Sequence, residues 1–159
     1  MGSSLGDTRM DVNLLNQQLV NLVTSMFQEG FLDEQFTQLQ MLQDARNPGF
    51  VADVISLFSV DSERLLAELT KTLEQYPADF KKVDAYVHQF KGSSSSIGAY
   101  RVKIACMDFH SFCEGHNREG CLLALQQLKQ EFYLVKTKLD VMLQMEQKLL
   151  AAGGVIPME

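Results

Sequence analysis

The chain has 159 residues, of which 46% are hydrophobic and 21% charged, and its formal net charge is −6. This length favours a single domain over residues 1–159, with a substantial core and with flexible ends at 1–10 and 154–159. An acidic balance argues against direct nucleic-acid binding, which normally shows as a basic patch. Because the sequence lacks a long apolar run and an N-terminal secretory pattern, we expect a soluble intracellular protein without a membrane partner.

The first half of the chain predicts three helices. Apolar residues at three- and four-residue steps indicate one helix over residues 11–30, closed by Gly30, and a second over 33–45. Pro48 suits the first turn of a third helix, which continues to about Gln75. The residues expected to face inward are Leu15, Leu19, Leu22, Val23, Met26, Phe36, Leu39, Val51, Val54, Ile55, Phe58, Leu65, Leu66, Leu69 and Leu73.

The second half predicts three more helices. Asp79 is expected to cap a helix that ends at Gly98, and the next helix covers residues 100–115. A very long final helix is expected over residues 117–154. About six helices with short connections and no strands predict an all-α fold, in which a four-helix bundle carries two additional N-terminal helices.

The helix that follows Asp79 separates into an apolar and a polar face at about 100° per residue. The polar face carries His88, with Gly92 and Ser95 close to it and Lys91 at its margin. The apolar face, expected to be buried, consists of Val83, Val87, Phe90, Ser94 and Ile97. His88 is therefore expected to face solvent, flanked by a lysine and by the gap that a glycine leaves.

These residue types suit nucleophilic chemistry at an imidazole. A neutral, exposed imidazole is a competent nucleophile near neutral pH, and the ammonium group of Lys91 can reach an anion formed on His88. Glycine inside a helix costs roughly 1 kcal/mol, so Gly92 requires a reason such as the close approach of another molecule. Ser95 could donate a hydrogen bond on this face, whereas small-residue packing explains the other serines. The alternative is that His88 is an ordinary solvated side chain.

The motif HQFKGSSSSIG, which begins at His88, resembles the signature of plant histidine-containing phosphotransfer (HPt) proteins that retain the phosphoacceptor histidine. The similarity extends to GFLDEQFTQLQMLQD, FVADVISLFSVDSERLLAELTKTLEQ and QMEQKLLAAGG, and so to nearly the whole chain. It implies an HPt-like bundle in which His88 is the phosphoacceptor, Lys91 stabilises the phosphate and Gly92 provides clearance.

The resemblance also implies a function. In this family the histidine receives a phosphoryl group from the receiver domain of a hybrid sensor histidine kinase and passes it to a response regulator, in a cytokinin-type two-component phosphorelay. The receiver supplies the aspartate and Mg²⁺, so the carrier would have no autonomous catalysis, cofactor or metal. We expect a monomer that occurs in cytoplasm and nucleus. A non-phosphorylated helical adaptor that binds receiver domains is the alternative function.

Docking of a receiver is expected to involve the His88 face, including Gly92 and Ser95, together with the second helix. Its outward residues are Gln38, Met41 and Leu42, and Met41 is the clearest apolar one, opposite Phe36 and Leu39. The alternative is that these three are ordinary surface residues.

A different constellation could bind zinc. Cys106, His110 and Cys113 share one helical face, with His116 close by. The spacing matches no common zinc motif, and structural packing of both cysteines in the core is the preferred interpretation. Because three cysteines without an export signal do not suggest a disulfide framework, we expect Cys121 and the other two to be reduced.

Overall fold

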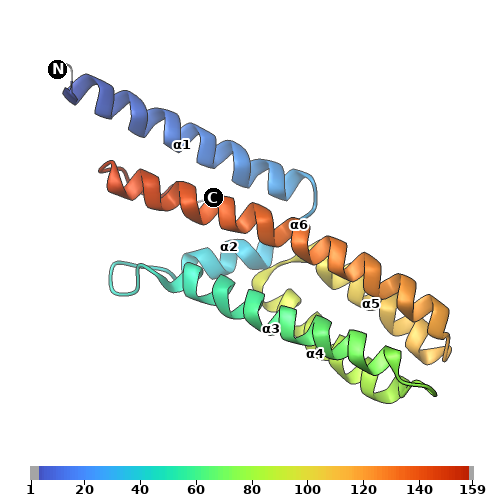
Figure 1. Ribbon diagram of the computed structural model, residues 1–159. Helices are drawn as coiled ribbons and strands as arrows, with labels where there is room; N and C mark the ends of the chain where they lie inside the picture. The colour runs from blue at the N-terminus through green and yellow to red at the C-terminus, as the bar shows by residue number, and fades with distance from the viewer. Residues whose placement is uncertain (1–3, 158–159) are drawn as a thin grey trace.

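The protein is described by a computed structural model that covers residues 4–157, with side chains described from residue 11 onward. Within that range the chain forms six helices and no strand, which confirms the all-α prediction (Figure 1). The helices are α1 (Ser4–Gln28), α2 (Glu34–Met41), α3 (Phe50–Glu74), α4 (Phe80–Ile97), α5 (Tyr100–Glu114) and α6 (Arg118–Ala151). None of the described helices combines the length and apolarity that crossing a bilayer requires.

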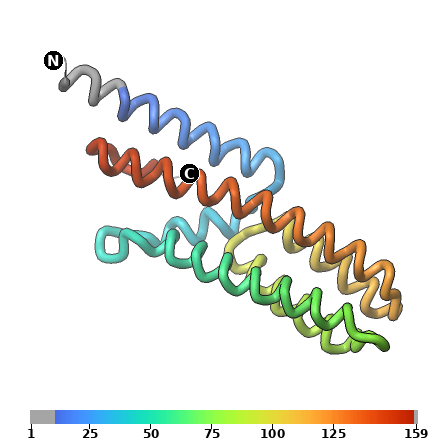
Figure 2. The backbone as a smooth tube through the Cα atoms, in the orientation of Figure 1, coloured from blue at the N-terminus to red at the C-terminus, as the bar shows by residue number. Residues whose placement is uncertain are grey.

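Helices α3, α4, α5 and α6 form a four-helix bundle, as predicted. In this bundle α4 packs against α3 and α5, and α6 closes the ring by contacting both α5 and α3. The long α6 extends beyond the bundle, and α1 lies along this extension (Figure 2). The short α2 packs against α4.

The connection between α2 and α3 differs from the prediction. Helix α2 ends at Met41 instead of continuing to residue 45, because Asp44 forms a turn in which its Oδ1 accepts hydrogen bonds from the backbone N–H groups of Arg46 and Asn47, at 2.9 and 3.1 Å. Helix α3 then begins at Phe50, two residues after the proline that was expected in its first turn. The final helix is also slightly shorter than predicted and ends at Ala151.

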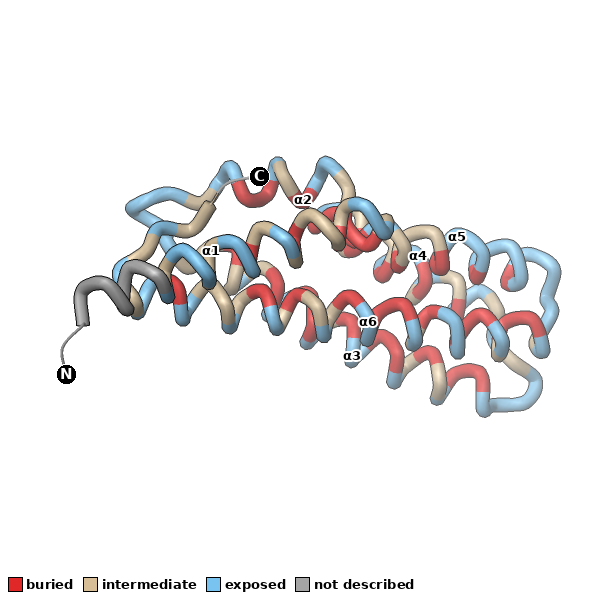
Figure 3. The backbone as a smooth tube through the Cα atoms, turned by 90° about the horizontal axis from the view of Figure 1, so that it is seen from above, coloured by how far each residue is buried: buried red, intermediate tan, exposed pale blue. Residues whose placement is uncertain are grey.

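The core follows the predicted stripes, and the buried positions lie on the inner sides of the helices (Figure 3). All five residues assigned to the apolar face of α4 are buried, as are the three cysteines. Three predicted core residues are only partly buried: Leu15, Leu22 and Val54. For the first two the reason is that α1 packs mainly against one helix, α6, and is not enclosed by the bundle.

The turn between α4 and α5 holds the loop between α1 and α2. Gly98 has a φ of 78°, which favours glycine, and a side chain there would collide with the backbone nitrogen of Phe36. The carbonyl of Gly98 accepts a hydrogen bond from the backbone of Asp33 at 3.0 Å, and Tyr100 donates one to Phe31 at 3.1 Å. These contacts fix the start of α2 at the C-terminal end of α4.

An ion pair with one buried partner reinforces the same region. The guanidinium of Arg101 on α5 makes two hydrogen bonds to the carboxylate of Glu131 on α6, at 2.5 and 2.7 Å. The Glu131 side chain is only 5% exposed, and the guanidinium also lies 4.2 Å from the ring centroid of Phe31. Arg101 therefore joins α5, α6 and the loop that follows α1.

Candidate functional site

Helix α4 is continuous through the glycine and the four serines. The side chain of Asp79 caps its start by accepting a hydrogen bond from the backbone N–H of Lys82 at 3.1 Å, and the helix ends at Gly98, as predicted. Because Val87 and Phe90 point into the core, His88 is exposed to solvent. The sequence-based assignment of two faces to this helix is therefore confirmed.

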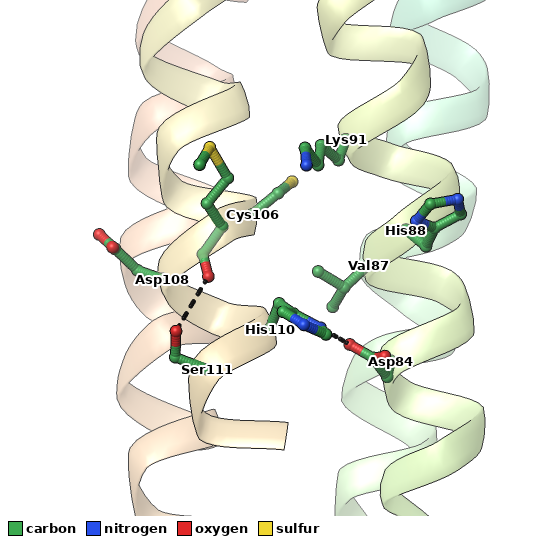
Figure 4. Close-up of a pocket in the computed structure, with 9 residues that line it drawn as sticks. Asp84, Val87, His88, Lys91, Cys106, Asp108, His110 and Ser111 are labelled. Atoms are coloured by element: carbon green, nitrogen blue, oxygen red, sulfur yellow. Dashed lines mark hydrogen bonds and ion pairs between the residues drawn. The ribbon is translucent and has the colours of Figure 1, made fainter. Parts of the chain in front are cut away.

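His88 lies at the edge of a groove between α4 and α5, with a volume of about 380 Å³ (Figure 4). Lys91, one turn further along α4, is partly buried and lines the same groove. The complete lining consists of Asp84, Val87, His88, Lys91, Cys106, Met107, Asp108, His110 and Ser111. His88 and Lys91 thus both line a surface that another molecule can reach, with the Lys91 ammonium directed towards α5 and the His88 ring directed away from it (Figure 4).

No contact within the described part of the chain explains why residue 92 is a glycine. A Cβ atom added there would meet no atom within 4 Å, apart from the backbone of its own helix, so the fold would accept a side chain. Glycine nevertheless weakens a helix by roughly 1 kcal/mol relative to alanine. Gly92 therefore lowers the stability of the helix without improving its packing. This combination is expected at a position where the absence of a side chain leaves room for a partner.

The serines that follow have local roles. Ser94 is fully buried and permits close packing, while the hydroxyls of Ser93 and Ser96 donate to the carbonyls of Phe90 and Gly92 at 3.1 and 3.0 Å. Ser95 is partly buried on the side of Gly92, and its part in the site stays a prediction.

A second histidine lies in the groove and was considered from the sequence only as a zinc ligand. His110 Nδ1 is 2.6 Å from Asp84 Oδ1, and its Nε2 is 2.6 Å from Glu114 Oε1. The hydrogen bond and charge of Asp84, with a smaller contribution from Glu114, raise the pKa of His110 above its usual value. The spacing of four residues on one helix could have indicated the Glu114 contact, whereas no sequence signal reveals the Asp84 contact, because it depends on how α5 is rotated against α4.

The cysteines are structural. Burial raises the pKa of the Cys106 thiol to about 12, although the positive charge of Lys91 opposes this effect. The sulfur atoms of Cys113 and Cys121 lie 3.9 Å apart, and burial also raises the pKa of both thiols. These thiols are therefore protonated at neutral pH and poor metal ligands.

The zinc alternative finds no support in this geometry. The ring of His110 is exposed and occupied by two carboxylates, whereas Cys106 and Cys113 are buried. Among the described side chains, no three from histidine, cysteine, aspartate and glutamate are grouped so that they could hold a metal ion.

The proposed docking residues on α2 are exposed but do not line the groove. Gln38 faces solvent, and the exposed fractions of Met41 and Leu42 are 63% and 64%. Helix α2 starts beside Gly98, and ten residues of helix from there to His88 correspond to about 15 Å. A partner that contacts the start of α2 as well as His88 must therefore extend beyond the groove, and docking at Gln38, Met41 and Leu42 stays a prediction.

Helix α5 contributes surface that the sequence interpretation missed. Met107 and Asp108 line the groove beside His88, and the exposed fraction of Met107 is 43%. Both lie outside the apolar stripe of α5 that contains Cys106 and Phe109. The helical periodicity of this segment could therefore have predicted that these two residues are at the surface.

Comparison with known proteins agrees with the fold and the motif. A family model described as "Hpt domain" matches residues 53–138. The chain is 54% identical over 148 residues to histidine-containing phosphotransfer protein 1 of Arabidopsis thaliana, which covers 93% of this chain and 96% of that protein. It is also 44% identical to pseudo histidine-containing phosphotransfer protein 2 of Oryza sativa subsp. japonica, over 82% of this chain and 87% of the relative.

A solved structure shows the same architecture. The crystal structure of a histidine-containing phosphotransfer protein from Medicago truncatula superimposes with a TM-score of 0.84 at 48% identity, covering 89% of this chain and 96% of that one. Sequence, fold and exposed histidine converge on one conclusion: the chain belongs to the family of histidine-containing phosphotransfer (HPt) proteins, which mediate phosphorelay in two-component signalling.

Proposed function

We propose that His88 is the phosphoacceptor of an authentic HPt protein. The observation that carries this proposal is the exposed imidazole of His88 in a groove that it shares with the ammonium group of Lys91. A ring nitrogen of His88 attacks the phosphorus atom of an aspartyl phosphate and forms an N–P bond. The P–O bond to the aspartyl carboxylate breaks, and its electron pair leaves with the carboxylate. The reverse step returns the phosphoryl group to another aspartate.

Lys91 and Gly92 support this step in different ways. The ammonium of Lys91 neutralises part of the charge on the phosphoryl group, since phosphoryl transfer depends mainly on positioning and electrostatic stabilisation. Gly92 leaves room for the partner's backbone, which agrees with the open space around it. Ser95, on the same side, would donate a hydrogen bond to the docked partner.

The partners are receiver domains of hybrid histidine kinases and of response regulators in a cytokinin-type pathway. The receiver provides the aspartate and Mg²⁺, and the HPt protein has no catalysis of its own. It docks through the His88 face and through Gln38, Met41 and Leu42. We further propose that it acts as a monomer and carries the signal between cytoplasm and nucleus. The net charge of −6 supports protein partners over nucleic acid.

The direct test is phosphotransfer from a phosphorylated receiver domain. We expect acid-labile, alkali-stable label on the wild-type protein and none on His88→Gln. His116→Asn is the matched control, because His116 has a φ of 50°, which asparagine tolerates, and stacks on Phe80 away from the groove. Label that persists on His88→Gln would exclude this phosphoacceptor, and receiver binding without any label would favour the adaptor.

The supporting residues can be tested separately. Lys91→Ala is expected to slow transfer at least tenfold without loss of helicity, whereas Lys82→Ala, an exposed lysine on the same helix, leaves the rate unchanged. Gly92→Leu is expected to slow transfer from a receiver but not labelling by phosphoramidate, a small phosphoryl donor. Equal effects on both donors would contradict the docking role of Gly92.

A further inference from the structure

His110 lies between two carboxylates that favour its protonated form. A neutral imidazole has one N–H donor, and only the imidazolium has two. Each ring nitrogen of His110 lies 2.6 Å from a carboxylate oxygen, one on Asp84 and one on Glu114. The Asp84 contact is a hydrogen bond, and the Glu114 contact is an ion pair when the ring carries a second proton, so the two carboxylates together favour the imidazolium.

This cation lies between α5 and the helix that carries His88. Asp84 precedes His88 by four residues, so the two side chains are on the same face of α4, one turn apart. Figure 4 shows the ring of His110 directed at the Asp84 carboxylate, beside the groove that His88 and Lys91 also line. Without His110, the Asp84 carboxylate would be an unpaired negative charge one turn from the nucleophile.

Few charged or titratable side chains surround His110 in the part of the chain that the structure describes. On α4 they are Asp84, Lys91 and His88 in the groove, with Lys81 in the adjoining one. On α5 they are Glu114 in contact and Asp108 at the edge of the groove, and His116 follows the helix. The charges that act on the ring most strongly come from Asp84 and Glu114.

We propose that His110 is a positioning residue for phosphotransfer, whose imidazolium neutralises Asp84 and thereby makes the groove accept a dianionic phosphoryl group on His88. The proposal rests on His88 being the phosphoacceptor. When His110 loses its proton, Asp84 regains its full charge and repels the phosphoryl group. The carrier therefore loses capacity as pH rises above the pKa of His110.

The repulsion has a calculable size. A like charge one helical turn away at an exposed site changes an equilibrium roughly 1.4- to 2.3-fold per unit charge, and the phosphoryl group carries close to two charges, so the expected effect is roughly two- to fivefold. The coupling is reciprocal at equilibrium, because a phosphoryl group on His88 also favours the proton on His110. The measured pKa of His110 should therefore rise by about 0.3 to 0.7 on phosphorylation of His88.

The first experiment uses potassium phosphoramidate and needs no receiver. His88 displaces ammonia, which leaves with the electron pair of the broken P–N bond. The pKa of His110 is measured by NMR titration before and after labelling, with His116 as the internal control. A rise at His110 but not at His116 supports the proposal, and an unchanged value at His110 on a labelled protein overturns it. Absence of label on His88 would instead overturn the proposed function.

The second experiment compares rates of phosphoramidate labelling across pH. Below the pKa of His110, His110→Gln is expected to react roughly two- to fivefold more slowly than wild type, and His110→Arg, a permanent cation, restores the rate. Because all variants share His88, the ratio of the wild-type to the His110→Arg rate isolates the titration of His110. This ratio should be near one at pH values below the pKa of His110. Above that pKa it should fall towards the ratio of the His110→Gln rate to the His110→Arg rate. A ratio that stays flat would refute the proposal.

Discussion

Removal of the Arg101 guanidinium is expected to destabilise the protein strongly. In Arg101→Met, the carboxylate of Glu131 loses both of its hydrogen bonds to a cation while it stays buried on α6. Methionine retains the apolar part of the side chain, so the change removes mainly the charge and the hydrogen bonds. The substitution also removes the cation that lies over the ring of Phe31.

The magnitude follows from burial. Breaking a fully buried ion pair from one side costs about 3 to 5 kcal/mol, but the Arg101 side chain is 39% exposed, so water can partly solvate the remaining carboxylate. This exposure reduces the electrostatic loss to about 2 kcal/mol, and the cation–π contact adds about 0.5 kcal/mol. We expect Arg101→Met to lose about 2 to 3 kcal/mol in free energy of unfolding.

Urea unfolding followed by circular dichroism measures this loss. The midpoint should fall while the slope of free energy against urea concentration stays constant. Arg64→Met is the matched control, because Arg64 pairs with Asp61 at the surface and its loss costs less than about 0.5 kcal/mol. The double variant Arg101→Met/Glu131→Leu should recover most of the stability, since no charge is left buried. Equal losses in the two single variants would refute this reasoning.

Three further substitutions give expected outcomes in the same assay. Gly98→Ala should cost about 2 to 3 kcal/mol, because it combines a positive φ with a collision against the backbone of Phe36. Gly92→Ala should instead gain about 0.5 to 1 kcal/mol; a loss would show that Gly92 serves the fold. Burial raises the pKa of Glu146 to about 7, so the folded state binds this proton more tightly than the unfolded state, and the resulting stability is present below about pH 4.5 and lost as pH rises through 7. Allowing for the partial exposure of Glu146, the free energy of unfolding of Glu146→Gln should exceed that of wild type by about 1 to 2 kcal/mol at pH 8 but not at pH 4. Equal free energies of unfolding for the two proteins at both pH values would contradict the burial argument.

Periodicity predicted most of the fold because the bundle uses local signals. The apolar stripe of α4 repeats at three- and four-residue steps, and its burial follows from this spacing alone. The exposure of His88 follows from the same geometry, since the residue lies opposite that stripe. The two ends of α4 could also be predicted from the sequence, because each depends on interactions within a few residues. The side chain of Asp79 caps the start of the helix, and the backbone freedom of Gly98 ends it.

The contacts that join helices were not predictable. Arg101 and Glu131 are 30 residues apart, and their pairing depends on how α5 and α6 are rotated against each other. The contact between His110 and Asp84 depends on α4 and α5 in the same way. The end of α2 was misplaced for a local reason: the side chain of Asp44 stabilises a turn that competes with continued helix.

Gly92 and Gly98 lie in the same motif, and the structure shows that only one of them is required by the fold. Both follow an apolar helical stripe, and the sequence gives each the same conformational freedom. At Gly98 the positive φ and the close backbone of Phe36 explain why no side chain is present, so this glycine serves the fold. At Gly92 the helix is regular and the surrounding space is open, so no contact within the described residues explains the missing side chain. A position that weakens its helix and gains no contact within the described residues is accounted for by the proposed docking of a phosphotransfer partner beside His88.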